Sequence, residues 1–156
     1  MQSGARRRLV GLGIAGLAAL SLPAFAQSER RVRRIGFLSA SNIESTAEWL
    51  EAFRKGMAEL GRVEGRDYAI DARYANADVQ VVPRLAAELV AARPDLILTT
   101  ADEAVRALSQ RTKTIPIVSA FTADFVGNGF AASLRRPGGN ITGLTNLARD
   151  LAAKRL

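Results

Sequence analysis

The sequence predicts an α/β fold, a flavodoxin-like parallel sheet flanked by helices and preceded by a signal peptide. Short apolar runs alternate with amphipathic helical stretches along residues 32–144, a pattern typical of parallel sheets with helices on both faces. Residues 1–26 instead follow the order of an export signal, with a basic start, an apolar stretch and small residues. Removing them leaves about 130 residues, the size of one domain.

The N-terminal segment also contains a Gly-x-Gly-x-x-Gly pattern at residues 11–16, which is found in dinucleotide-binding loops. Three arginines at 6–8 occupy the place of the buried strand that such a loop requires. The apolar run 9–22 is shorter than the roughly 20 residues of a membrane span, and Ala-Phe-Ala follows at 24–26. We therefore predict a cleaved signal peptide at 1–26 and a soluble periplasmic protein. The basic start favours Sec export and leaves the twin-arginine route open.

Composition excludes several functions. The chain has 22 Lys and Arg residues, 15 Asp and Glu residues, and neither His nor Cys, so the usual zinc, haem and Cys/His nucleophile sites are unavailable. Four arginines cluster at 30–34, and we interpret residues 27–31 as part of a solvated basic flank. We expect no catalytic residue, no metal, no cofactor, no nucleic-acid partner and no stable membrane insertion after signal removal.

The first strand and helix follow this flank. The apolar run that ends the segment 32–39 predicts a buried parallel strand, and the Ser- and Thr-rich segment 41–46 predicts a loop with helix-capping residues. A helix is expected over 46–60, closed by Gly61 as the residue after its cap. Its predicted apolar face, which we expect to pack in the core, consists of Trp49, Leu50, Phe53, Met57 and Leu60.

The remaining elements repeat this alternation. Residues 67–74 alternate apolar and polar side chains, as an edge strand does. A helix over 79–92 tolerates Pro83 only in its first turn, and its apolar stripe is Val82, Leu85, Leu89 and Val90. Further along, we predict a strand at 95–100, a helix at 102–110, a strand at 115–121, a short helical stretch at 129–134, a strand at 140–144 and the start of a helix at 150–156.

Ligands of parallel α/β sheets bind beyond the carboxyl ends of the strands. With the expected strand order 2-1-3-4-5, this rule selects a rim of polar and small residues as a ligand site. Two other interpretations of these positions remain open. Ser39, Ser41 and Thr100 could serve as helix caps, and Asp124 could order its own loop without binding a ligand. The predicted rim is Ser39, Ala40, Ser41, Thr100, Ala101, Asp102, Thr122 and Asp124.

Three motifs carry a resemblance to a known family: the Glu-Gly turn at 64–65, Thr-Ile-Pro-Ile-Val at 114–118, and Arg-Pro-Gly-Gly-Asn-Ile-Thr-Gly-Leu at 136–144. With them, residues 32–156 resemble the N-terminal lobe of the ABC transporter substrate-binding protein family, which includes TrpX-like members and has the type I periplasmic binding fold. The resemblance implies a non-catalytic protein that binds a small organic solute, with an amino acid as one candidate, and passes it to an ABC permease in the inner membrane. It places five of the rim residues on the ligand-facing edge: Ser39, Ala40, Thr100, Ala101 and Asp124.

The sequence departs from the family pattern after its third and fourth strands. Members often have Gly-Gly-Thr-Pro where this chain has Thr-Thr-Ala-Asp-Glu at 99–103, and Asp-Pro-Val-Gly where it has Asp-Phe-Val-Gly at 124–127. We expect an N-terminal lobe at 32–144, then a hinge and the start of a truncated second lobe at 145–156. The alternative is a flavodoxin-like or receiver-like domain with an enzymatic or signalling role, although the first strand ends in neither an acidic pair nor a phosphate-binding loop.

Overall fold

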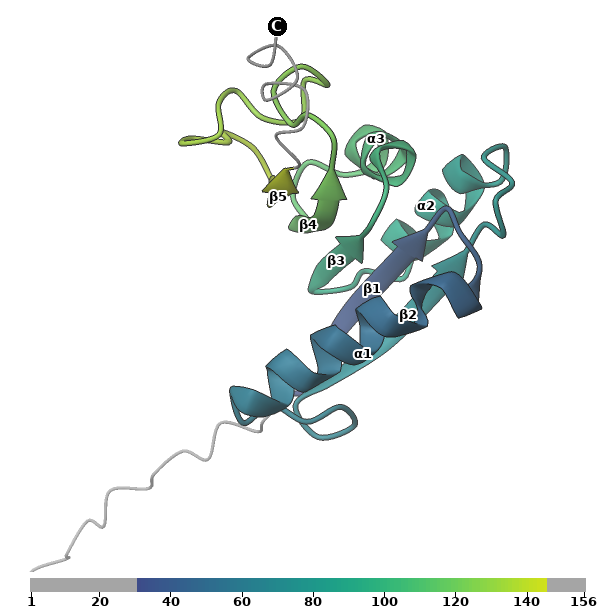
Figure 1. The fold of residues 1–156 in the computed structure, drawn as a ribbon, viewed down its shortest axis with the longest axis vertical. Helices are drawn as coiled ribbons and strands as arrows, with labels where there is room; N and C mark the ends of the chain where they lie inside the picture. Colours follow the sequence, from purple (N-terminus) through teal and green to yellow (C-terminus); the bar gives the residue numbers. More distant parts are fainter. Residues whose placement is uncertain (1–30, 146–156) are drawn as a thin grey trace, which may run out of the picture.

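Five parallel strands form the sheet in the computed structural model, which describes residues 31–145 (Figure 1). The strand order is β2-β1-β3-β4-β5, the order expected of a flavodoxin-like sheet, so the predicted parallel α/β sheet flanked by helices is confirmed. The elements are β1 (Arg33–Ser39), α1 (Ile43–Glu59), β2 (Tyr68–Tyr74), α2 (Val82–Ala91), β3 (Leu96–Thr99), α3 (Asp102–Arg111), β4 (Ile117–Thr122) and β5 (Ile141–Thr145).

Helix α1 begins three residues earlier than the sequence predicted. Its N-cap is Asn42, whose side-chain oxygen accepts a hydrogen bond from the backbone N–H of Ser45 at 2.9 Å. Several residues in 41–46 are suitable caps, and only the tertiary position of the helix decides which one is used. The predicted end is correct, because Gly61 follows the C-cap with a φ of 71° that suits glycine.

The apolar face of α1 is buried only in part. Leu50 is buried, and the ring of Phe53 meets that of Tyr68 on β2 edge to face, with centroids 5.9 Å apart. Burial also raises the pKa of the Tyr68 hydroxyl. Trp49 and Leu60, however, are 46% and 76% exposed, so the prediction that both belong to the core is wrong. A helix resting over the edge strand of a sheet buries only a narrow stripe of its surface.

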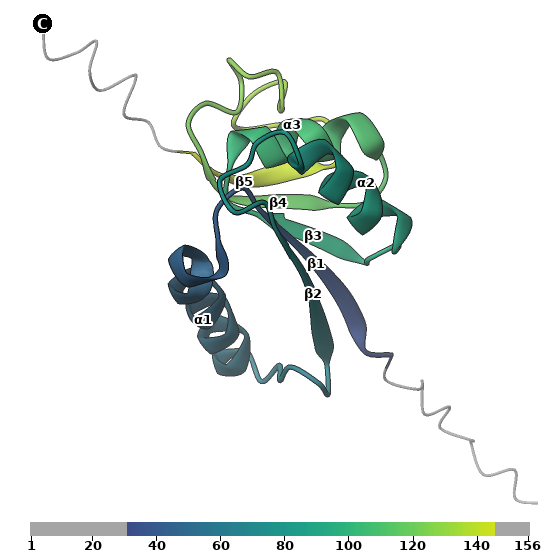
Figure 2. The ribbon, with the colours of Figure 1, turned by 90° about the vertical axis from the view of Figure 1, so that its right-hand side faces the viewer.

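Helices cover both faces of the sheet, α1 on one and α2 with α3 on the other (Figure 2). The apolar stripe predicted for α2 is confirmed: Val82, Leu85 and Leu89 are buried, and Val90 is half-buried against the same core. A Cβ atom added to Gly36 of β1 would lie 3.0 Å from the side chain of Leu89, so the glycine lets α2 approach the sheet closely. Leu144 of the edge strand β5 is 70% exposed.

The short helix predicted at 129–134 is absent, and an irregular loop connects β4 to β5. Phe125 and Phe130 anchor this loop in the core, and the guanidinium of Arg106 on α3 lies 5.4 Å from the centre of the Phe130 ring. Gly129 has a φ of 72°, which interrupts a right-handed helix. The loop is therefore attached to the core by two aromatic side chains, and a helical turn is not needed.

The edge strand β5 approaches β4 closely at Gly143. Gly143 pairs with Ser119, and a Cβ atom built on it would lie 2.0 Å from the backbone oxygen of Ser119. Its φ of 153° is also one that L side chains rarely adopt. Glycine in the Asn-Ile-Thr-Gly-Leu motif is therefore required by backbone packing.

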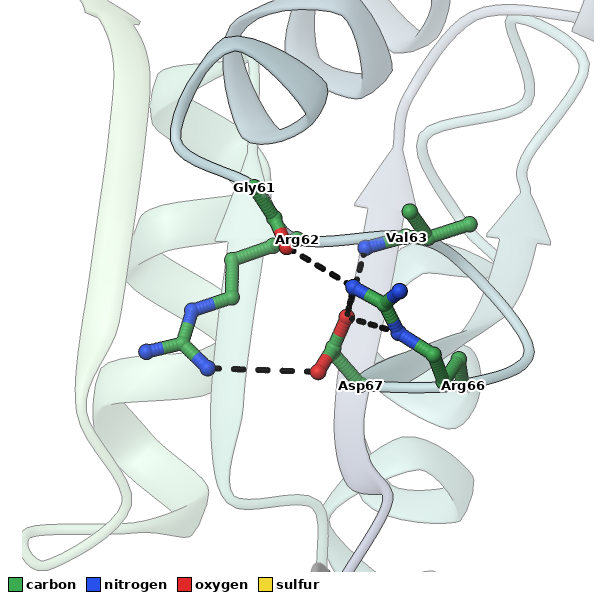
Figure 3. A network of polar contacts seen from close by, with 5 residues as sticks. All are labelled: Gly61, Arg62, Val63, Arg66 and Asp67. Atoms are coloured by element: carbon green, nitrogen blue, oxygen red, sulfur yellow. Dashed lines mark hydrogen bonds and ion pairs between the residues drawn. The ribbon is translucent and has the colours of Figure 1, made fainter.

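The turn between α1 and β2 is organised by a buried carboxylate (Figure 3). The side chain of Asp67 is 5% exposed, and its Oδ2 accepts hydrogen bonds from the Val63 backbone N–H at 2.9 Å and from Arg66 Nη2 at 2.7 Å. Arg66 Nη2 also donates to the Gly61 carbonyl, and Arg62 lies 3.9 Å from Asp67 Oδ1. A buried charge is tolerated when it is paired and hydrogen-bonded in this way, so Asp67 fixes the path of the Glu-Gly turn.

Some predictions lie outside the described residues. The signal peptide at 1–26 and the helix expected at 150–156 are among them, and the domain boundaries stay predictions. Within residues 31–145, each helix is too short or too polar to cross a membrane.

Candidate functional site

The carboxyl ends of β1, β3 and β4 meet at one edge of the sheet (Figure 1). Because the strands are parallel and neighbouring, the predicted rim residues that follow them are brought together at this edge. Ser39 ends β1, Thr100 follows β3, and Thr122 ends β4. The structure thus places all three rim segments on the same edge, as the strand order required.

The β1 segment of the rim is held by its own hydrogen bonds. Ser39 is fully buried, and its Oγ accepts a hydrogen bond from the backbone N–H of Ser41 at 3.0 Å. Neither serine caps α1, because Asn42 has that role. Ser41 is exposed and Ala40 is half-buried, so these two residues form the accessible part of the segment.

A fourth segment of this edge, residues 75–78 after β2, was not predicted from the sequence. Its backbone continues the pairing with the β1 segment: Ala75 N–H donates to the Ser39 carbonyl at 2.9 Å, and Ala77 N–H donates to the Ala40 carbonyl at 2.8 Å. Asn76 and Ala77 have positive φ values of 52° and 65°, a conformation that costs alanine roughly 1–2 kcal/mol. An Asn in a short polar stretch signals a turn, but only the topology shows that this turn adjoins the rim.

The amino end of α3 points its first backbone N–H groups toward this edge without a side-chain cap. Its N-cap is Ala101, which has an extended backbone and no side chain able to accept a hydrogen bond. The predicted capping role of Thr100 is therefore not realised. The uncapped N–H groups of a helix start favour an anion such as a carboxylate.

Asp102 connects α3 to the loop after β4, and Asp124 lies within that loop. Asp102 Oδ2 accepts a hydrogen bond from Asn128 Nδ2 at 3.0 Å, and its Oδ1 lies 3.4 Å from the backbone nitrogen of Ala123, which donates to it. Asp124 Oδ1 accepts from the Gly127 backbone N–H at 2.7 Å. Asp124 therefore orders its own turn, while both aspartates remain only half-buried and can be reached by a ligand.

Thr122 lies beneath the rim. It is fully buried, and its hydroxyl donates to Ser119 Oγ at 2.8 Å, which in turn donates to the Phe121 carbonyl at 2.8 Å. This chain of hydroxyls holds the end of β4 where its pairing with β5 shifts register between Ser119 and Thr122. Of the eight predicted positions, Ser39 and Thr122 thus support the rim, and the other six are accessible at it.

The rim is acidic. The connecting segments 75–81, 100–103 and 123–131 contain carboxylates and neither Lys nor Arg. Within residues 31–145, no group of acidic side chains is arranged to hold a metal ion. A cavity of about 300 Å³ lies beside β5 and is lined mainly by uncharged residues such as Phe125, Leu134 and Ile141, but it does not include the six accessible rim residues. The carboxylates at the rim are Asp78, Asp102, Glu103 and Asp124.

A parallel sheet with helices on both faces is the architecture of an α/β lobe, and ligands of such sheets bind beyond the carboxyl ends of the strands. The family model for ABC transporter substrate binding proteins matches residues 35–153. The chain belongs to this family. Members are binding proteins that work with ABC transporters and are typically extracellular or periplasmic.

Known proteins agree with this assignment. The chain is 27% identical over 117 residues to a tyrosine-binding protein of Clostridioides difficile strain R20291, covering 75% of this chain and 34% of the relative. The structure of an ABC domain in complex with L-Trp from Streptococcus pneumonia is 29% identical, with a TM-score of 0.67, covering 74% of this chain and 39% of that one. A ligand-free, open substrate binding protein with adhesive properties from Clostridium difficile is 25% identical, with a TM-score of 0.68 and the same two coverages. The chain therefore spans about a third of the length of the curated relative and about two fifths of the solved structures.

Proposed function

We propose that the chain is the solute-binding component of an ABC importer and takes a small organic ligand, an amino acid by preference, at the carboxyl-end rim. The observation that carries the proposal is that groups suited to an anion and groups suited to a cation lie at the same edge of the sheet. The backbone N–H groups at the start of α3 have no side-chain cap and suit a carboxylate. Asp102 and Glu103 in the first turn of α3, and Asp124 in the loop that Asp102 contacts, suit an ammonium group. The relatives described above, one named for tyrosine and one in complex with L-Trp, support this ligand class.

Binding without catalysis is part of the same proposal. The rim offers no hydroxyl paired with a base: Ser39 and Thr122 are buried and engaged within the protein. Family membership favours solute binding over the flavodoxin-like or receiver-like alternative. We infer that the protein is exported to the periplasm through a signal peptide at residues 1–26 and meets its permease at the inner membrane.

A ligand screen by thermal shift and calorimetry tests the binding proposal. We expect one or more amino acids to raise the Tm of the full chain. Asp124→Asn separates the two roles of the side chain, because asparagine keeps an oxygen that can accept the Gly127 N–H bond but lacks the charge that an ammonium group needs. We expect at least a tenfold loss of affinity. Glu59→Gln, at the far end of α1, removes one charge away from the rim and serves as the control.

The outcomes separate the parts of the proposal. If a ligand is found and Asp124→Asn binds it as tightly as the parent chain does, the role given to Asp124 is wrong. If amino acids, sugars and other small organic acids and amines all leave the Tm unchanged, the solute-binding proposal fails for this chain. Export is tested by the mass of the protein recovered from the periplasm, which should lack residues 1–26.

A further inference from the structure

The edge of the sheet opposite the rim concentrates positive charge. We define the basic edge as residues 31–34, 60–67, 92–95, 111–116 and 132–140, which precede the five strands. Each segment contains at least one Arg or Lys, and together they hold ten basic side chains against three carboxylates. Parallel strands bring all five segments to the same edge (Figure 1). With strands about 4.8 Å apart, the sheet is roughly 19 Å wide at this edge.

The three carboxylates are committed to the fold. Asp67 is buried in the turn before β2. Asp95 accepts a hydrogen bond from the Arg34 backbone N–H at 2.8 Å and pairs with Arg31 at 3.0 Å. The Arg34 N–H and the neighbouring arginines hold the pKa of the Asp95 carboxyl below its ordinary value. Glu64 pairs with Arg54 on α1. None of the three is left to neutralise the rest of the edge.

Six basic side chains of the edge are exposed and form no ion pair with another described residue. They come from four of the five segments, so they are spread across the edge. The segments of the basic edge contain no aromatic residue, and aromatic platforms are what single-stranded nucleic acids stack on. A broad surface of exposed basic side chains, which also exposes the apolar side chains of Leu60, Val63 and Leu134, suits a bilayer of anionic lipids. The six are Arg34, Arg93, Arg111, Lys113, Arg135 and Arg136.

We propose that the basic edge binds the anionic headgroups of a membrane surface. Each Lys or Arg near such a surface strengthens binding roughly fivefold, and the attraction decays within a screening length of about 8–10 Å at physiological salt. An association through this edge holds the lobe at the membrane and turns the acidic rim away from it. The rim then stays open to solutes while the protein remains near membrane-embedded transporters. The inference stands independently of the ligand proposed above.

Binding of the full chain to phosphatidylglycerol and phosphatidylethanolamine vesicles, compared with phosphatidylcholine vesicles, tests the inference. The edge variant carries Arg111→Gln, Lys113→Gln, Arg135→Gln and Arg136→Gln. The control variant makes the same charge change elsewhere on the described residues, with Lys55→Gln, Arg73→Gln, Arg84→Gln and Arg106→Gln. All proteins share residues 9–22, so any apolar insertion by that segment is common to them. Insertion of apolar residues is also insensitive to salt, whereas binding by the basic edge is screened.

We expect salt-sensitive binding to the anionic vesicles that disappears in phosphatidylcholine and in about 1 M NaCl, where the screening length is about 3 Å. The edge variant should bind at least about tenfold more weakly, and the control variant within about twofold of the parent chain. Equal weakening by both variants would overturn the inference, because net charge alone would then explain binding. The inference is also overturned if the chain binds anionic vesicles no more tightly than phosphatidylcholine vesicles. Binding to duplex DNA or heparin without binding to vesicles would overturn it as well. Circular dichroism confirms that each variant is folded.

Discussion

Replacing Gly143 by alanine tests the account of the β4–β5 pairing most directly. The added Cβ atom would lie 2.0 Å from the Ser119 backbone oxygen and 2.8 Å from its carbonyl carbon. Real Cβ atoms do not approach other atoms closer than 3.0 Å, so the strands must separate by about an ångström. The obstacle is backbone, which cannot rotate away as a side chain can. The substitution therefore strains φ and weakens the ladder at the same time.

The expected cost follows from these two effects. A residue forced into an unfavourable backbone conformation costs about 1–3 kcal/mol, and each weakened ladder hydrogen bond costs about 0.5–1.5 kcal/mol. We expect Gly143→Ala to lower the free energy of unfolding by about 2–5 kcal/mol. For a domain of this size, that shifts the urea midpoint down by about 1–2 M. Urea denaturation followed by circular dichroism measures the change.

Gly56→Ala provides the matched control. Gly56 lies inside α1, and a Cβ atom built on it meets no atom within 4 Å. Alanine is favoured over glycine inside a helix by about 0.5–1 kcal/mol, so this variant should be slightly more stable than the parent chain. If Gly143→Ala unfolds within about 0.5 kcal/mol of the parent, the close approach of β4 and β5 is refuted.

Two further predictions concern carboxylates. Asp67→Asn keeps the side-chain shape but removes the charge that Arg66 contacts through two nitrogens. We expect the free energy of unfolding in urea to fall by about 1.5–3 kcal/mol, because the hydrogen bonds at this buried position lose their charged acceptor. A loss under about 0.5 kcal/mol would contradict the role of this turn. Asp95 has a pKa below its ordinary value of 3.8, so its contribution to stability is present above about pH 4 and is lost as the pH falls through the lower pKa of the folded state. Asp95→Asn should therefore have a lower free energy of unfolding than the parent chain at pH 6, as measured by urea denaturation. This difference in free energy should shrink as the pH is lowered. A difference that stays constant down to pH 2 would show that the charge of Asp95 is not involved.

The sequence predicted the fold class and most elements because the periodicity of apolar residues is a local property. The stripe at Val82, Leu85 and Leu89, the cap-following Gly61 and the edge strand β2 needed no long-range information. Predicted strand bounds differed from the observed ones by at most two residues, since the end of a strand is set by its neighbours. The rim was predictable in outline because parallel strands must share their carboxyl ends.

What the sequence by itself determined was this local alternation, together with the residues that follow each strand. Only the tertiary structure decided that Trp49 is exposed and that residues 75–78 join the rim. It also decided where the positive charge lies: in the sequence, only the arginines before the first strand form an obvious cluster. Parallel topology gathers the basic residues of five distant connections on one edge, because every strand begins there. Side-chain burial and the distribution of surface charge depend on which segments become neighbours in space. Local sequence patterns do not show which segments these are.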